Sequence, residues 1–125
     1  MAEKKSHAKV RPLDAKLHQV EVLGEMTSLL QRVRGNKSKR TTSNLVTTGP
    51  LRINVIALDE GGELADHKVE GPFTIQCLLG RVRVLVEGDQ RMTTGDLLVA
   101  DAAITHTIRV EEASVLFITI APRED

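Results

Sequence analysis

Aromatic residues are scarce in this chain of 125 residues. They make up 2% of it, because the chain has two phenylalanines and neither tyrosine nor tryptophan. Hydrophobic residues nevertheless account for 41%, so the core must be built from valine, isoleucine, leucine and alanine. A core rich in β-branched side chains is typical of strands. The same scarcity excludes aromatic ligand cages and base-stacking platforms for single-stranded nucleic acid.

The chain also has only one cysteine, Cys77, and no long apolar run. A single cysteine excludes an internal disulfide and fits a reducing compartment. No run approaches the roughly 20 apolar residues that span a bilayer, and Met1–Val10 lacks the apolar centre of a secretion signal. We therefore expect a cytoplasmic, single-domain protein that makes no membrane contact. Cys77 has no charged neighbour that would lower its thiol pKa, so we expect it in the core.

Net charge is zero, but the two signs are separated along the chain. Residues 1–50 hold 10 Lys or Arg against 4 Asp or Glu, whereas residues 51–125 hold 7 against 13. A basic arm therefore precedes an acidic body. Such an arm could contact nucleic acid or form a solvated tail. Because no aromatic residues lie between its basic ones, we expect the tail and no nucleic-acid partner.

The arm, residues 1–43, contains a short predicted helix. Asp14 can cap the helix and Gly35-Asn36 can end it. Its apolar positions recur with helical spacing at Leu23, Met26, Leu30 and Val33. The segment His18–Leu23 also alternates like a short strand, which leaves an extended arm as the alternative. The apolar stripe is expected to cover the body of the protein or a partner subunit.

From residue 44 to residue 125, short apolar segments are separated by glycine turns with no helical pattern between them. This order favours a β-sandwich or barrel over βαβ units. We predict an all-β, double-sheet jelly roll. The expected strands are Asn44–Thr48, Leu51–Asp59, Phe73–Leu79, Arg81–Glu87, Leu97–Ala100, Thr105–Val110 and Ser114–Ile120.

Two segments each place a glycine ahead of a histidine. They are GGELADHKVEGPFTIQCLLG, which starts at Gly61, and GDLLVADAAITH, which starts at Gly95. Together they resemble the cupin family, whose motifs read G-x5-H-x-H-x(3,4)-E-x6-G and G-x5-P-x-G-x2-H-x3-N. The resemblance covers residues 45–121 and implies an RmlC-like barrel, also described as a double-stranded β-helix.

The motifs match at three glycines and at one histidine each, namely Gly61, His67, Gly80, Gly95 and His106. Val69 stands where the second histidine of the first motif belongs, and Phe73 stands where its glutamate belongs. In the second motif, the proline, glycine and asparagine are replaced by Asp101, Ala103 and Val110. The spacing is therefore kept while most of the metal-binding chemistry is not.

The resemblance implies that these positions point into the mouth of the barrel, where cupins bind a divalent transition metal such as Fe, Mn, Zn or Ni. It predicts a ligand pocket formed by His67, Val69, Phe73 and His106, with His67 and His106 as the two metal ligands. A catalytic metal usually has three or more protein ligands. The candidates for a third are Glu63, Asp66, Glu70, Gln76 and Asp101. Gln76 is a poor one because it alternates with Ile75 and Cys77.

The residues leave the function open. The incomplete ligand set favours a non-enzymatic protein that binds a small molecule or has a regulatory role. The alternative is a metal-dependent enzyme, such as a dioxygenase, isomerase or lyase, that uses His67, His106 and an atypical third ligand. A nucleic-acid-linked regulator that docks Lys4–Arg40 on phosphates is least favoured, because no recognition helix is visible. The resemblance and the exposed edges of a lone sandwich both predict a homodimer.

Overall fold

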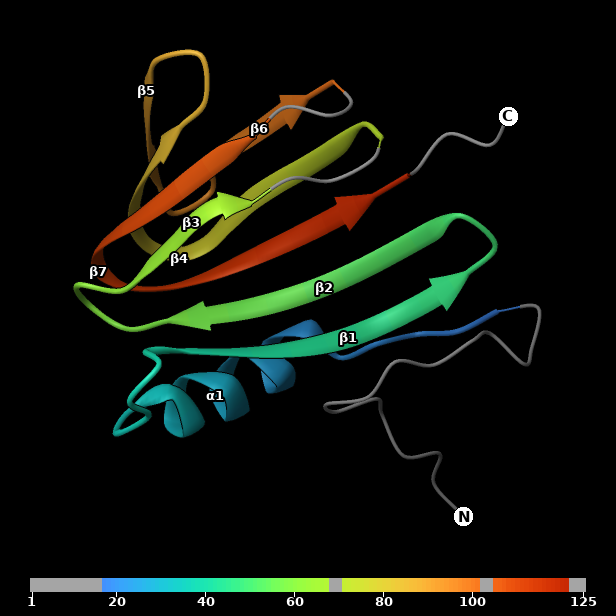
Figure 1. The fold of residues 1–125 in the computed structure, drawn as a ribbon. Helices are drawn as coiled ribbons and strands as arrows, with labels where there is room; N and C mark the ends of the chain where they lie inside the picture. The colour runs from blue at the N-terminus through green and yellow to red at the C-terminus, as the bar shows by residue number, and fades with distance from the viewer. Residues whose placement is uncertain (1–16, 68–70, 102–104, 122–125) are drawn as a thin grey trace.

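The computed structural model describes residues 17–67, 71–101 and 105–121, with the backbone alone at residues 66 and 67. One helix, α1 (Val22–Val33), precedes the β region (Figure 1). The strands are β1 (Arg40–Thr48), β2 (Leu51–Leu58), β3 (Glu63–His67), β4 (Phe73–Leu85), β5 (Asp89–Thr93), β6 (Leu97–Ala100) and β7 (His106–Ile120). All strand pairs are antiparallel.

Two long bent strands, β4 and β7, belong to both layers of the fold. In the first layer, the segments Phe73–Leu79 of β4 and Val115–Ile120 of β7 pair with each other. Strand β6 pairs with the free edge of this β4 segment, and β2, followed by β1, pairs with the free edge of the β7 segment. Beyond the bend, the remaining halves pair again, now flanked by β5 and β3. The two layers are therefore β1-β2-β7-β4-β6 and β3-β7-β4-β5. This arrangement confirms the predicted jelly roll.

The bends correct the strand boundaries expected from sequence. Glycine at position 80 was expected to separate two strands, but β4 continues through it with three register shifts between Cys77 and Val82. The segments expected as a closing pair are likewise one strand, β7. Bulges of this kind increase the bend of a strand without ending it. Continuous hydrogen bonding therefore overrides the local turn signal at Gly80.

Both faces of β2 are buried, because its alternating side chains enter two different clusters. Ile56 and Leu58 belong to the inner cluster between the two layers, which also contains Phe73 and Cys77. Val55 and Ala57 point outward into a second cluster with Leu29, Val33 and Leu45. Helix α1 thus covers the outer face of β1 and β2, as the sequence predicted for its apolar stripe.

The helix itself differs from the prediction in its start and in its buried side. It begins at Val22, and residues 17–21 are neither helical nor part of a strand, so the alternative strand over His18–Leu23 is wrong. Leu23 is 70% exposed, whereas Leu29 is fully buried. Glu25 is also buried and accepts a hydrogen bond from the Ser43 hydroxyl at 3.3 Å. The buried side of the helix is therefore rotated away from Leu23.

Three strands differ from the sequence-based prediction. Strand β1 starts at Arg40, inside the expected basic arm of residues 1–43, and crosses the expected boundary between arm and barrel. Strands β3 and β5 were not anticipated because their sequences, ELADH and DQRMT, are mostly polar. Strands β2 and β6 lie where they were predicted. Among the described residues, no helix is long and apolar enough to cross a membrane.

Candidate functional site

The two motif histidines occupy paired positions in the sheet. His67 ends β3 and His106 begins β7, and their Cα atoms are direct partners in the antiparallel register. They are 39 positions apart in sequence, so the pairing depends on closure of the jelly roll and on no local element. The structure therefore brings together the two positions that the sequence singled out, at the level of the backbone.

His106 is also in contact with Phe73, the residue at the position of the family glutamate. The two ring centroids lie 5.0 Å apart with an interplanar angle of 29°, which is a stacked arrangement. His106 is 3% exposed and Phe73 is 3% exposed. Aromatic pairs at this separation stabilise a fold beyond their buried area. An apolar ring thus lies against the imidazole, at the position where the family motif has a carboxylate.

The other predicted site residues lie in different environments. Val69 and Glu70 are outside the described residues, as is Ala103. Glu63 forms an ion pair with Arg109 at 3.0 Å, and Gln76 belongs to the face of β4 opposite Ile75 and Cys77, as predicted. In the part of the chain whose side chains are described, no group of three potential metal ligands is present. The described residues therefore do not complete the donor set of a catalytic metal.

Two hollows are each lined by a register partner of Phe73. In the register, Phe73 pairs with Ile120 on one side and with Ala100 on the other. Ile120 lines a hollow of about 400 Å³ between β1, β2, β3 and β7. Ala100 lines a second hollow of about 340 Å³ beside β5 and β6. Both volumes fall within the range of small-molecule sites.

The first hollow, which we call the arginine hollow, has an apolar floor and a polar rim. Its floor is formed by Ile56, Leu64, Ile118 and Ile120. Its rim is formed by Arg40, Thr42 and Asn54. The floor residues belong to the inner cluster of the barrel, so the hollow lies directly over the core. Sequence reasoning missed the rim, because Arg40 and Thr42 were assigned to the basic arm and not to a strand of the barrel.

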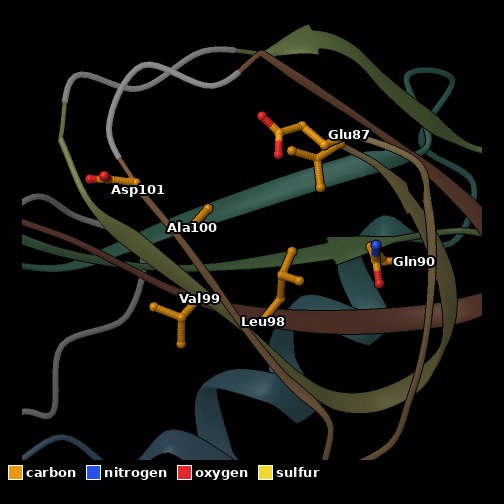
Figure 2. Close-up of a pocket in the computed structure, with 7 residues that line it drawn as sticks. Glu87, Gln90, Leu98, Val99, Ala100 and Asp101 are labelled. Atoms are coloured by element: carbon orange, nitrogen blue, oxygen red, sulfur yellow. The ribbon is translucent and has the colours of Figure 1, made fainter.

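The second hollow, which we call the Glu87 hollow, carries acidic side chains. Its lining residues are Val86, Glu87, Gln90, Leu98, Val99, Ala100 and Asp101. Leu98 points into it, while Val99 turns to the other side of β6 (Figure 2). Glu87 has a φ of 46°, a left-handed conformation that is uncommon for residues other than glycine. The two hollows therefore differ in charge: the described acidic lining residues belong to the Glu87 hollow and the described basic one to the arginine hollow.

Cys77, the only thiol, is not part of either hollow's described lining. It is fully buried in the inner cluster and its Sγ donates to the carbonyl of Leu79 at 3.4 Å. Burial raises the pKa of the Cys77 thiol above its ordinary value, the hydrogen bond to Leu79 lowers it, and the charge of Asp96 raises it. The raised pKa keeps the thiol protonated and unreactive at neutral pH, which confirms the expected core role.

Comparison with solved structures finds many similar barrels. A cupin superfamily protein from Desulfitobacterium hafniense matches with a TM-score of 0.69 and 12% identity, covering 93% of this chain and 100% of that one. An RmlC-like cupin from Shewanella frigidimarina matches with a TM-score of 0.64 and 20% identity, covering 72% and 82%. A salicylate 1,2-dioxygenase variant from Pseudoaminobacter salicylatoxidans matches with a TM-score of 0.65 and 19% identity, covering 77% and 31%.

The sequence alone gives no such match. No protein-family model matches the chain, and no curated protein matches it either. At these identities the similarity to solved structures concerns the fold, which hosts unrelated activities. The jelly-roll topology, the paired motif histidines and the structural matches agree, and the protein is a small barrel with the RmlC-like cupin fold.

Proposed function

We propose that this protein is a non-enzymatic small-molecule-binding protein whose ligand occupies the barrel interior beside Phe73 and His106. The centre of the proposed site is the predicted pocket, formed by His67, Val69, Phe73 and His106. In this proposal the pocket has too few ligands to hold a catalytic metal. Two hollows of suitable size are lined by Ala100 and Ile120, the register partners of Phe73. A buried, largely apolar interior with a few polar groups at its rim is typical of small-molecule sites.

The stacking of Phe73 on His106 carries the proposal. The metal-binding motif places a carboxylate where the phenyl ring lies, and imidazole and carboxylate ligands together hold Fe(II), Mn or Zn. The ring instead keeps this part of the inner cluster apolar, and its register partners Ala100 and Ile120 line the two hollows. The apolar lining residues of the hollows favour binding of an apolar part of a ligand by burial of area, at about 25 cal/mol per Å².

The first prediction concerns metal content. Protein purified without chelator is expected to contain well under one transition-metal ion per chain, because two imidazoles alone hold an ion weakly. Elemental analysis by mass spectrometry measures this directly, and a His106→Ala variant is the matched control. A stoichiometry near one ion per chain, lost in the variant, would contradict the proposal.

That contrary result would favour the second candidate, a metal-dependent enzyme such as a dioxygenase, isomerase or lyase. The observation in its favour is the pairing of His67 with His106. The third ligand would then come from Asp66, Glu70 or Asp101, and the metal would be Fe, Mn, Zn or Ni. A bound metal of this kind polarises a substrate or activates water or oxygen.

We also propose that the protein is a homodimer that forms through β6, in the cytoplasm. Leu97 and Val99 are 58% and 68% exposed on the outer side of this strand, and β6 pairs only with β4 among the described strands. A second copy would cover the side chains and the strand edge together.

The second prediction tests this dimer. The Val99→Glu variant is expected to sediment as a monomer at micromolar concentrations where the wild-type protein is a dimer, because a charge replaces an apolar contact in the interface. Leu23→Glu, the same kind of change at an apolar residue of α1 that is 70% exposed, is the matched control. A wild-type protein that sediments as a monomer would disprove the dimer.

A further inference from the structure

Arg40 is a cation at the edge of an apolar hollow and has no described acidic partner. Its guanidinium forms none of the ion pairs found among the described residues, whereas Arg81, Arg83 and Arg109 each pair with a carboxylate. None of the described residues that line the arginine hollow is acidic. Among the described residues, no carboxylate therefore pairs with the charge of Arg40.

The backbone holds Arg40 in a defined position. Its carbonyl accepts hydrogen bonds from the Asn36 side-chain amide at 3.0 Å and from the Ser38 hydroxyl at 3.1 Å. Its Cα is the partner of Leu58, a fully buried residue of β2. A charged group that starts from a fixed backbone loses less conformational freedom on binding than one on a mobile tail.

The neighbouring polar groups suit the same kind of ligand. Thr42 and Asn54 belong to β1 and β2 and add a hydroxyl and a side-chain amide to the rim. Arg52 precedes Asn54 by two residues on β2, so it lies on the same face, and its Cα is the partner of Ile120 in the floor. A second cation therefore stands near the end of the hollow opposite to Arg40.

Resting on the proposed binding function, we propose that the arginine hollow binds a small carboxylate with an apolar body. The carboxylate contacts the guanidinium of Arg40, which matches it in a bidentate geometry. Asn54 and Thr42 donate further hydrogen bonds to it. The apolar body lies on Ile56, Ile118 and Ile120 and reaches toward the Phe73–His106 stack.

The third prediction tests the charge preference with benzoate and its neutral isostere benzamide, both titrated into the full chain by NMR and calorimetry. Benzoate is expected to bind about tenfold or more tightly than benzamide, because charge-assisted hydrogen bonds are roughly twice as strong as neutral ones. Its shift changes are expected at Thr42 and Asn54. Arg40→Gln is expected to remove this difference, and Arg91→Gln, the same change on β5, is expected to preserve it.

The outcomes separate this inference from the function on which it rests. Equal binding of both compounds, or shift changes confined to the Glu87 hollow, would overturn the carboxylate site and leave an interior that binds small molecules. No binding of either compound at millimolar concentration would overturn both. A preference for benzoate that persists in Arg40→Gln would also overturn the assignment of Arg40.

Discussion

Replacing Gly80 by alanine is expected to destabilise the protein by about 4 kcal/mol. Gly80 has a φ of 106°, and a Cβ atom built on it would lie 2.1 Å from Ser114 Oγ and 2.5 Å from the carbonyl oxygen of Ala113. Both neighbours belong to β7 at the bend shared by the two layers. The methyl group must therefore displace a strand of the sheet and also adopt a strained backbone conformation.

Gly95→Ala is the matched control for this prediction. Gly95 has a similar φ of 97°, but no heavy atom lies within 4 Å of its Cβ position, so only the backbone strain of about 1–2 kcal/mol is expected. Urea unfolding followed by far-ultraviolet circular dichroism measures both free energies, because the chain lacks tryptophan and tyrosine. Equal losses in the two variants would show that β7 does not approach Gly80 closely.

The same bend shows why the fold was predictable while its strand boundaries were not. Alternating apolar residues identified the core face of β4, with Phe73, Ile75 and Cys77 buried as a set. A glycine such as Gly80 can indicate either a turn or a close approach of two backbones, and a single sequence does not distinguish the two. The partner strand decides between them, and that partner lies more than 30 positions away at Ser114.

Part of the candidate site was likewise predictable from the sequence, and part was not. Motif spacing located His67 and His106, which the register pairs, and it located Phe73, which stacks on His106. It could not locate Arg40 or Asn54, because their common environment arises from the pairing of β1 with β2 and from the return of β7. Their role as pocket residues is visible only once three strands are assembled.

Replacing Phe73 by glutamate is expected to cost about 5 kcal/mol at neutral pH. Loss of the buried ring accounts for about 3–5 kcal/mol, and burying a carboxyl group adds to it. Burial raises the pKa of the introduced carboxyl above its unfolded value. The carboxyl group therefore loses its proton at a lower pH in the unfolded chain than in the folded one. As a result, the free energy of unfolding decreases as the pH rises from the pKa of the unfolded state to that of the folded state. Below the unfolded pKa this additional, pH-dependent loss is absent.

Phe73→Leu is the control, because it keeps the site apolar and costs about 1.5 kcal/mol or less of unfolding free energy with no added pH dependence.

Zinc ions then distinguish a degenerate metal site from an unrelated apolar one. If His67, His106 and the introduced carboxylate converge as they do in the family that the motifs resemble, zinc at 100 times its Kd restores about 2.7 kcal/mol to Phe73→Glu alone. Equal urea midpoints for Phe73→Glu with and without zinc would show that the two histidine positions, although paired in the sheet, do not share a metal-binding centre.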